Sequence, residues 1–541
     1  MKVCEAMIHC LEAEGVSVLF GYPGAAICPF YDALSRSSIR HILVRTEQNA
    51  AHAASGFSRI SGKCGVCVAT SGPGATNLIS GIASAYMDSI PLVILTGQVN
   101  SALLGRDVFQ EVDITGSVEP FIKHSFLVKN PAEICRVMKE AFYIAASGRP
   151  GPVLIDVPMD IQNCETRFSY PEEIQIRSYK PSSKGHPGQI KRAAEAICHA
   201  DRPILCAGGG VFGSGAQQIL GEFLSRIRMP AVHTLMGIGA IPHTAPLQLG
   251  MIGVHGEKSA NLAIERADLL LLAGTRIGDR SVPNPELLSR HKKVIHIDID
   301  PAEIGKNIPA DIPVVGDLKL VLSQLLEVLQ PLSFADWEHE IRFYQKQHAP
   351  ALSEQEYVDP GCFFPQLYRR MNPDAILTAD VGQNQIWAAR QYALPFGRFL
   401  TSGGMGTMGY AIPAALGAKT AAPNRQVVAV CGDGSFQMSM MELATLCQHQ
   451  IPVKLVVFVN RSLGMVRELQ QRQYGSLEAV ALDGSPDFVK LAEAYGIPAL
   501  RATKNDAVPE ALDAFFREPG TILLEVQVNP EEPTLPVSLY E

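Results

Sequence analysis

Asp433 and Asn460 are the two residues whose type and spacing most clearly indicate chemistry. Asp433 lies in the run Cys431-Gly-Asp-Gly-Ser, directly after a predicted strand over 427–430, and Asn460 directly follows a second predicted strand over 453–459. Parallel strands of an open α/β sheet present their carboxyl ends at one edge, and ligands bind there. Glycine amides at the start of a helix attract phosphate, while a carboxylate and an amide oxygen suit Mg²⁺. The pattern predicts a site for a phosphate-bearing ligand with magnesium, although a Gly-Asp-Gly triplet alone is usually a simple turn.

Glu47 is a second candidate, because a predicted strand over 42–44 passes into a helix at this point. A side chain at such a junction can be presented to a ligand, and a carboxylate there could act in proton transfer. A structural role is the alternative, since Thr46 suits the N-cap position and the helix dipole stabilises a Glu in the first turn. The residues alone favour the structural role.

The elements that must position these residues fall into three segments. Strand-like apolar runs alternate with helical periods, as in parallel α/β domains, and polar connectors over 163–188 and 330–360 interrupt them. We expect domains over 1–165, 186–330 and 358–541. After the glycine loop at Asp433, a helix is expected to begin between Gln437 and Met441.

The first and third segments resemble each other. Each runs from a glycine loop through a helix to a strand, and the intervals Gly72–Pro91 and Gly432–Pro452 differ by one residue. Chance similarity between α/β units is the alternative explanation. We therefore predict an α/β protein with three doubly wound parallel sheets, in which two related domains flank a different one.

Composition limits the partners and the compartment. A net charge of −8 argues against nucleic acid or an anionic membrane surface. No apolar run approaches the roughly 18 residues of a membrane span, and the N-terminal segment resembles neither a signal nor a transit peptide. The twelve cysteines lie mostly in apolar segments, which favours reduced thiols. Cys64 and Cys67 have redox spacing, but three residues apart in a strand they point to opposite faces. We expect a cytoplasmic protein.

Longer motifs occur in one order along nearly the whole chain. They are Phe20-Gly-Tyr-Pro-Gly-Ala, Glu47-Gln-Asn-Ala-Ala-His-Ala-Ala, Ala69-Thr-Ser-Gly-Pro-Gly-Ala-Thr-Asn, Ala85-Tyr-Met-Asp-Ser-Ile-Pro, Val294-Ile-His-Ile-Asp-Ile-Asp-Pro, Thr401-Ser-Gly-Gly-Met-Gly-Thr-Met-Gly, Gly432-Asp-Gly-Ser-Phe-Gln-Met and Leu463-Gly-Met-Val-Arg. Together they resemble the catalytic subunit of acetohydroxyacid synthase (acetolactate synthase), a thiamine-diphosphate carboligase. The resemblance implies a pyrimidine-binding domain, a central FAD-binding-type domain and a diphosphate-binding domain.

The resemblance also implies the residues of the site. The catalytic group comprises Glu47, which polarises the aminopyrimidine ring of the cofactor, together with Gln110, Arg276 and Met408. Thiamine diphosphate contacts are implied for Tyr22, Pro23, Gly24, Pro73, Asn77, Gly382, Gln383, Asn384, Gln385, Gly406, Met408, Gly432, Asp433, Gly434, Ser435, Asn460, Leu463, Gly464 and Met465. Magnesium is implied at Asp433, Asn460 and the carbonyl of Ser462. A structural FAD is implied at Gly208, Gly209, Gly210, Thr234, Leu235, Met236, His255, Gly274, Arg276 and Asp298, although glycine loops in α/β domains are usually mere turns.

The implied reaction decarboxylates pyruvate and joins the two-carbon unit to a second 2-keto acid. Its products are 2-acetolactate and, from 2-oxobutyrate, 2-aceto-2-hydroxybutyrate, in branched-chain amino acid biosynthesis. The implied assembly is a homodimer or tetramer in which Glu47 of one chain faces Asp433 of another, with a small regulatory subunit among the partners. Phe109 and Gln110 reach the reaction centre from the neighbouring chain. Alternatives are a related carboligase or decarboxylase with another acceptor, an FAD-independent fermentative acetolactate synthase, and a cofactor-binding homologue that acts by interaction.

Several residues depart from the family pattern. Thr46 and Asn384 replace histidines, Met159 replaces a lysine, and Leu469 replaces a tryptophan. The usual Arg-Phe-Asp-Asp-Arg run reads Arg276-Ile-Gly-Asp-Arg, and a short tail after Leu535 stands in place of a longer capping segment. These changes leave the cofactor chemistry intact but leave acceptor choice and regulation open.

Overall fold

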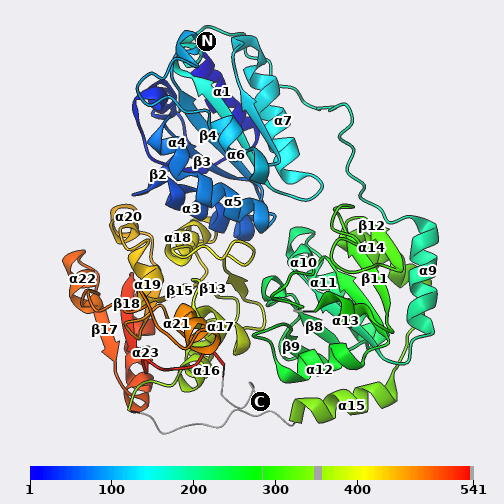
Figure 1. The fold of residues 1–541 in the computed structure, drawn as a ribbon. Coiled ribbons are helices and arrows are strands. Elements are labelled where there is room, and N and C mark those ends of the chain that lie inside the picture. Colours follow the sequence, from blue (N-terminus) through cyan, green and yellow to red (C-terminus); the bar gives the residue numbers. More distant parts are fainter. Residues whose placement is uncertain (283, 347–355, 536–541) are drawn as a thin grey trace.

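A computed structural model describes residues 1–282, 284–346 and 356–535. Three parallel sheets, each with six strands, form the frame of these residues, and helices cover them (Figure 1). The predicted α/β class with three parallel sheets is confirmed. The tail that follows Leu535 and part of the second connector lie outside the described residues.

The N-terminal sheet has the order β2-β1-β3-β4-β6-β5. Its strands are β1 (Val18–Gly21), β2 (Arg40–Leu43), β3 (Gly65–Ala69), β4 (Leu92–Gln98), β5 (His124–Leu127) and β6 (Pro152–Pro158). The helices are α1 (Val3–Ala13), α2 (Cys28–Leu34), α3 (Glu47–Ser61), α4 (Pro73–Asn77), α5 (Ile79–Met87), α6 (Ile114–Val118), α7 (Ile134–Ala146) and α8 (Met159–Asn163). The strands are nearly continuous apolar runs because helices bury both faces of the sheet.

The C-terminal sheet repeats this topology with the order β14-β13-β15-β16-β18-β17. Its strands are β13 (Ile376–Ala379), β14 (Arg398–Leu400), β15 (Val427–Gly432), β16 (Lys454–Val459), β17 (Ala499–Ala502) and β18 (Ile522–Gln527). The helices are α16 (Pro360–Arg370), α17 (Gln383–Arg390), α18 (Ala411–Ala421), α19 (Asp433–Gln437), α20 (Glu442–His449), α21 (Gly464–Gln473), α22 (Phe488–Ala494) and α23 (Val508–Arg517). Position by position, the strand order matches the first sheet, as the internal repeat predicted.

The middle sheet has a different order, β12-β11-β10-β7-β8-β9. Its strands are β7 (Pro203–Ala207), β8 (Ala231–His233), β9 (Gln248–Met251), β10 (Leu269–Ala273), β11 (Lys293–Asp298) and β12 (Ile312–Val315). The helices are α9 (Pro187–Cys198), α10 (Gly210–Gly213), α11 (Gln217–Ile227), α12 (Lys258–Arg266), α13 (Pro285–Ser289), α14 (Leu318–Val328) and α15 (Ala335–Lys346). The chain runs outward from β7 and then returns to β10 beside it, which creates a topological switch point between these two strands.

Two local predictions were wrong. The helix after the glycine loop begins at Asp433 rather than near Gln437, and a turn separates it from α20. The second connector contains α15, because Trp337, Ile341 and Tyr344 form an apolar stripe that packs into the core of the middle domain. The first connector has no helix or strand from Cys164 to His186 and runs between the N-terminal and middle domains (Figure 1).

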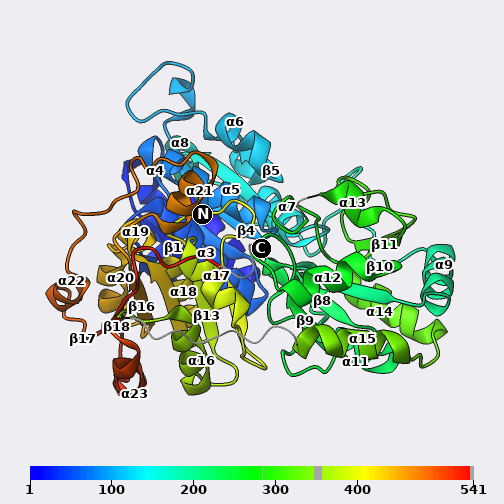
Figure 2. The same cartoon turned by 60° about the horizontal axis from the view of Figure 1, so that its bottom comes forward.

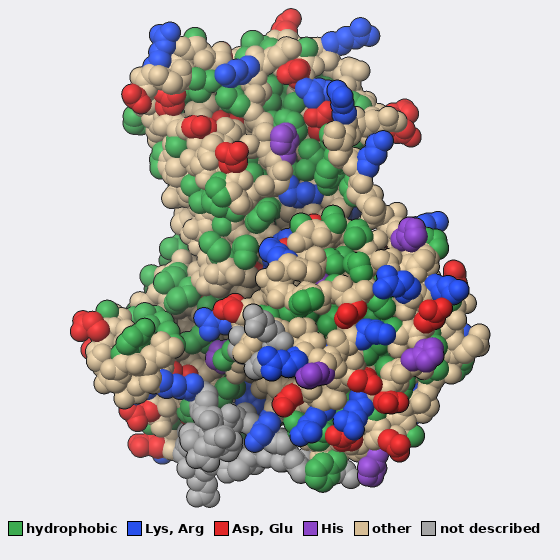
Figure 3. Space-filling view, turned by 45° about the vertical axis from the view of Figure 1, so that its right-hand side comes forward, with side chains coloured by type: hydrophobic (Ala, Val, Ile, Leu, Met, Phe, Trp, Pro, Cys, Tyr) green, Lys and Arg blue, Asp and Glu red, His purple; other side chains and the backbone are tan. Residues whose placement is uncertain are grey.

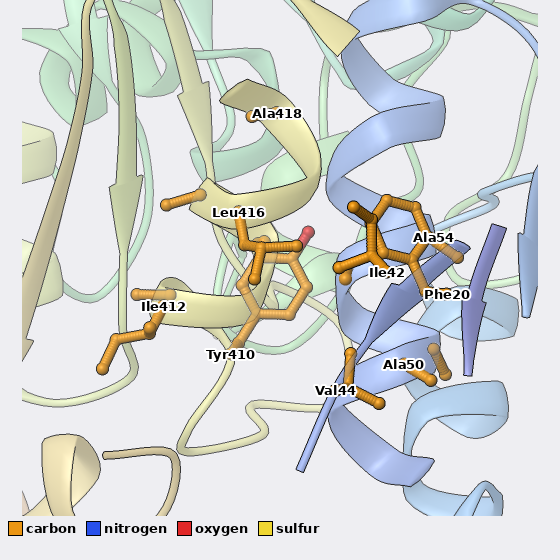
Figure 4. Close-up of a cluster of buried hydrophobic side chains, with 14 of the residues drawn as sticks. Phe20, Ile42, Val44, Ala50, Ala54, Tyr410, Ile412, Leu416 and Ala418 are labelled. Atoms are coloured by element: carbon orange, nitrogen blue, oxygen red, sulfur yellow. The ribbon is translucent and has the colours of Figure 1, made fainter. Parts of the chain in front are cut away.

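The N-terminal and C-terminal domains share one hydrophobic core, in which α3 packs against α18. Phe20, Ile42 and Ala54 of the first domain contribute to the same cluster as Tyr410 and Leu416 of the third (Figure 4). A Cβ atom on Gly56 would collide with the Ala414 carbonyl, so the two helices approach closely only because glycine lies between them. These two domains form a single packed unit.

The middle domain is attached by ion pairs and by apolar packing against the third domain. Arg149 of the first domain pairs with Glu303 at 2.6 Å and Asp300 at 3.4 Å, and Arg390 of the third pairs with Glu257 at 3.0 Å. On the face shown in Figure 3, basic and acidic side chains are interspersed rather than separated by sign. Among the described residues, none of the helices combines the length and apolar character that crossing a bilayer requires.

Candidate active site

Asp433 lies at the end of β15 with its carboxylate held by backbone amides. One carboxylate oxygen accepts a 2.6 Å hydrogen bond from Arg461 N–H, and the other accepts one of 2.9 Å from Gly434 N–H. The residue is 2% exposed, and burial raises the pKa of its carboxyl group to about 6. Within the described residues no Lys, Arg or His side chain pairs with this carboxylate, and a buried carboxylate of this kind is suited to receive a metal ion.

Asn460 follows the neighbouring strand β16, and the two strand ends bring it next to Asp433. Its amide oxygen accepts from Ser462 N–H at 3.0 Å, and its amide nitrogen donates to Gln383 Oε1 at 3.0 Å. An amide oxygen can accept twice, so Oδ1 retains capacity for a cation. The carboxylate, the amide oxygen and the Ser462 carbonyl are hard oxygen donors from one loop edge, and they fit Mg²⁺.

Met408 lies against this loop. Its methyl carbon is 3.6 Å from the position that a Cβ on Gly434 would occupy, and Leu463 approaches the same position to 2.8 Å. Gly406 and Gly409 flank Met408 with φ values of +67° and +87°, which favour glycine. The Gly406–Gly409 turn thus brings Met408 to Gly434.

Asp380 holds this turn, and we did not predict it from the sequence. Its carboxylate accepts from Gly409 N–H at 2.8 Å and from Ala411 N–H at 2.9 Å. The residue is fully buried, and burial raises the pKa of its carboxyl group to about 6. The signal available in the sequence was an Asp directly after the apolar run that forms β13.

Asn384 is turned inward. Its amide nitrogen donates to the carbonyl oxygens of Asp380 at 2.8 Å and Val430 at 3.3 Å, and its oxygen lies 3.2 Å from a Cβ position on Gly432. This residue therefore braces β13 against β15, and its donors are already used by the protein. Its neighbours Gln383 and Gln385 are also buried, and Gln385 donates to Thr401 Oγ1 at 2.6 Å.

Glu47 begins α3 in the first domain, and the residue is 9% exposed. Thr46 is the N-cap and accepts from Asn49 N–H at 3.3 Å. Asn77, at the end of α4, donates its amide to Glu47 Oε2 at 3.0 Å. The other oxygen, Oε1, would lie 3.3 Å from a Cβ on Gly74, so glycine keeps the approach to it open. Asn77 therefore orients the carboxylate and leaves one oxygen available.

The remaining predicted contacts of the first domain surround the same edge of the sheet. Tyr22, Pro23 and Gly24 follow β1, and Pro73 begins α4 after Gly72. Gln110 lies against Gly72, where a Cβ would be 2.9 Å from the Gln110 Cα. The segment between β4 and α6 that carries Gln110 projects from the molecule (Figure 2), and Phe109 within it is 85% exposed.

Glu47 and Asp433 belong to two separate hydrogen-bonded groups within the described residues. Among the described residues, no hydrogen bond or ion pair connects Glu47 or Asn77 with Asp433, Asn460 or Met408. The structure groups Glu47, Asn77 and Gly74 at one place, and Met408, Gly434, Asp433, Asn460 and Leu463 at another. Gly464 packs directly against the second group, because a Cβ there would collide with Gln383 Oε1.

The predicted flavin residues lie at the carboxyl edge of the middle sheet. Gly208 to Gly210 follow β7, Thr234 to Met236 follow β8, His255 follows β9, Gly274 and Arg276 follow β10, and Asp298 ends β11. The loops after β7 and β10 touch through backbone, since a Cβ on Gly208 would collide with the Gly274 carbonyl. Both loops lie at the switch point, where nucleotides bind in this topology. The Nδ1 atom of His255 is buried without a hydrogen-bond partner.

Arg276 follows β10 and is a half-buried cation near charged residues of the first and middle domains. No hydrogen bond or ion pair is formed by its guanidinium within the described part of the chain, and its charged neighbours at longer range are Arg149, Glu303, Asp88 and Asp298. Burial lowers the pKa of Arg276, yet a guanidinium stays charged at neutral pH. Its fork is available for a carboxylate.

Comparison with known proteins defines the class. Residues 1–117 match the N-terminal TPP binding domain of thiamine pyrophosphate enzymes, residues 190–325 match the central domain, and residues 380–526 match the C-terminal TPP binding domain. These three stretches contain strands β1 to β4 of the first sheet, the whole middle sheet, most of the third sheet and both groups of site residues. Fold and site together are those of a thiamine pyrophosphate enzyme.

Relatives that match nearly the whole chain identify the family within this class of enzymes. A probable acetolactate synthase large subunit from Methanocaldococcus jannaschii is 47% identical over 98% of this chain and 93% of its own length. The acetolactate synthase isozyme 3 large subunit of Escherichia coli is 44% identical over 99% and 96%, and an acetolactate synthase of Mycobacterium bovis is 45% identical over 94% and 85%. The chain belongs to the acetolactate synthase large-subunit family, which confirms the resemblance seen in the motifs.

Proposed function

We propose that this chain is the catalytic subunit of an acetolactate synthase in branched-chain amino acid biosynthesis. It decarboxylates pyruvate and transfers the two-carbon unit to a second 2-keto acid, giving 2-acetolactate or 2-aceto-2-hydroxybutyrate. The observation that carries the proposal is full-length similarity to acetolactate synthases together with two intact half-sites, one around Glu47 and one around Asp433.

Thiamine diphosphate, when bound, supplies the nucleophilic carbon and the electron sink that decarboxylation needs. Asp433, Asn460 and the Ser462 carbonyl would hold the Mg²⁺ for the diphosphate. Glu47 Oε1 would hold a proton for exchange with the aminopyrimidine ring, and Asn77 fixes the orientation of that carboxylate. Met408, which lies against Gly434, would support the cofactor. Arg276 binds the carboxylate of the second keto acid through its planar fork.

The complete site forms between two chains. Glu47 of one chain then faces Asp433 of its partner, which agrees with the absence of hydrogen bonds between the two groups within the described residues of one chain. Dimers or tetramers provide this arrangement, and a small regulatory subunit is a further partner, since relatives carry the name large subunit. The protein acts in the cytoplasm on small 2-keto acids.

FAD binds at the switch point of the middle sheet in a structural role, because the proposed reaction has no net redox change. The support is the contact between the loops at Gly208 and Gly274, the unpartnered His255 nitrogen and the similarity to the central domain of the family. The purified protein should be yellow, with a flavin band at about 450 nm. A colourless, fully active enzyme would contradict the proposal that FAD binds. Failure of a deazaflavin to support activity would contradict the proposal that the role of FAD is structural.

A product assay tests the proposed function. The purified chain is incubated with pyruvate, thiamine diphosphate and Mg²⁺, with and without 2-oxobutyrate, and the products are separated and quantified. Acetolactate from pyruvate alone and a mixture of both acetohydroxy acids with 2-oxobutyrate is the expected result. Acetaldehyde as the main product would instead indicate a decarboxylase.

A further inference from the structure

The segment Thr401–Gly404 leads from β14 to the turn that carries Met408. Ser402 connects the two directly, because its hydroxyl accepts a 3.1 Å hydrogen bond from Thr407 N–H. Displacement of this segment would therefore move Met408 relative to Gly434. The segment has no helix or strand of its own, so neighbouring groups must fix its position.

Three side chains of the first domain hold this segment. Arg59, in the last turn of α3, donates to the Thr401 carbonyl at 2.7 Å. Ser84, in α5, shares a 3.0 Å hydrogen bond with the Ser402 hydroxyl. Asp88, directly after α5, accepts from Gly403 N–H at 3.2 Å and from Gly404 N–H at 2.7 Å. Each of the four residues of the segment is thus fixed from another domain.

The packing leaves little room for movement. A Cβ on Gly404 would lie 2.9 Å from the Met87 Cβ and 3.0 Å from Asp88 Oδ1. A Cβ on Gly403 would collide with the Met236 sulfur of the middle domain. All three domains therefore meet at this pair of glycines, and any side chain there would push Asp88 or Met236 away.

Burying the carboxylate of Asp88 costs free energy. Burial raises the pKa of its carboxyl group, while the two glycine amides and the charges of Arg59 and Arg276 act in the opposite direction. No ion pair within 4 Å involves Asp88 among the described residues. A purely structural function is the alternative, but the apolar core between α3 and α18 already joins these domains over a large area.

We propose that Asp88 is a positioning residue. It holds Gly403 and Gly404 so that Met408 keeps its position relative to the Asp433 loop. Ser84 assists it through Ser402. This inference rests on the proposed function, because Met408 matters only if it supports the cofactor. Removing the Asp88 hydrogen bonds should leave a folded holoenzyme in which the cofactor is bound but poorly aligned for proton transfer.

The experiment measures proton–deuterium exchange at C2 of bound thiamine diphosphate, at saturating cofactor and Mg²⁺, by NMR of quenched samples. Asp88→Asn should exchange at least about tenfold more slowly than the wild type, since misplacement by about 1 Å can cost two orders of magnitude. Ser84→Ala should slow exchange less and in the same direction. Asp32→Asn, an identical change at an exposed ion pair with Arg36, is the matched control and should exchange normally.

Wild-type exchange in folded Asp88→Asn holoenzyme would overturn the proposal, since a residue that only joins domains would lower thermal stability and leave this rate unchanged. If Asp88→Asn does not fold, Ser84→Ala decides: slowed exchange supports the inference and a wild-type rate overturns it. Failure of the proposed function has a different signature, namely a wild-type holoenzyme that exchanges its C2 proton but forms no acetohydroxy acid.

Discussion

The first and third sheets have the same strand order, yet the loops at equivalent strand ends carry different groups. After β3, the loop Ser71-Gly-Pro-Gly has no charged side chain, and the carboxylate near it is Glu47 from α3. After β15, the loop Gly432-Asp-Gly-Ser carries its own carboxylate, Asp433. The comparison shows how one topology supports two tasks.

The hydrogen bonds of the two carboxylates explain the difference. Asp433 is held by two main-chain amides, which keep a carboxylate ionised for a metal once a cation balances its burial. Glu47 is held by one side-chain amide and keeps one oxygen next to Gly74, where a ligand nitrogen can approach. One carboxylate is placed to hold a cation, and the other to exchange a proton.

Asp433→Ala should have the largest effect of the variants proposed, because it removes one of the two carboxylates compared above. The variant should lose Mg²⁺-dependent binding of thiamine diphosphate, since no other carboxylate of the described residues accepts from the amides that hold Asp433. Isothermal calorimetry measures the loss, with Asp32→Asn as the control for a missing carboxylate elsewhere. Retention of wild-type cofactor affinity would assign the metal to other residues.

Glu47→Gln should separate proton transfer from binding. Gln retains the shape and the hydrogen-bonding capacity toward Asn77, so the fold and cofactor affinity should be preserved. Turnover should fall by at least about 10²-fold, a typical scale for lost acid–base assistance. Steady-state kinetics together with calorimetry on the same preparation check this, and near-normal turnover would favour the purely structural role of Glu47 in the first turn of α3.

Magnesium affinity should depend on pH through Asp433. The folded protein holds the pKa of this carboxyl group near 6, above the usual 3.8, so the apo protein binds an additional proton between these values. Its stability therefore falls as pH rises through this window, and the bound cation offsets the loss above pH 6. Thermal unfolding with and without cofactor and Mg²⁺ should show a larger stabilisation at pH 7.5 than at pH 5. Equal stabilisation at both pH values would contradict a proton–metal competition at Asp433.

Leu469→Trp should give the smallest effect, on acceptor choice. Leu469 lies on α21 with 49% of its surface exposed, so it is not part of the apolar core. A flat tryptophan wall should favour the additional methylene of 2-oxobutyrate over pyruvate by about 1–3 kcal/mol. Competition between the two acceptors measures the product ratio. Strong 2-oxobutyrate preference in the wild type, unchanged in the variant, would refute a role for this position.

The sequence predicted the three sheets and their repeat because apolar runs and glycine loops are local signals. It did not predict that Asn77 binds Glu47, because a long-range hydrogen bond leaves no trace in spacing. Asp380 was missed for the same reason, since its partners at Gly409 and Ala411 are 29 and 31 residues away. The inward turn of Asn384 depends on carbonyls of β13 and β15, which only the folded sheet brings together.

The most direct test of the account asks whether the two carboxylates of one site come from different chains. Dimers are purified with one chain carrying Glu47→Gln and the other Asp433→Ala, using two affinity tags. One of the two sites is then intact, so about half of the wild-type activity per dimer is expected. Dimers that pair a doubly substituted chain with a wild-type chain are the control and should be inactive. Activity in that control, with none in the mixed dimer, would place both carboxylates in one chain and contradict the account.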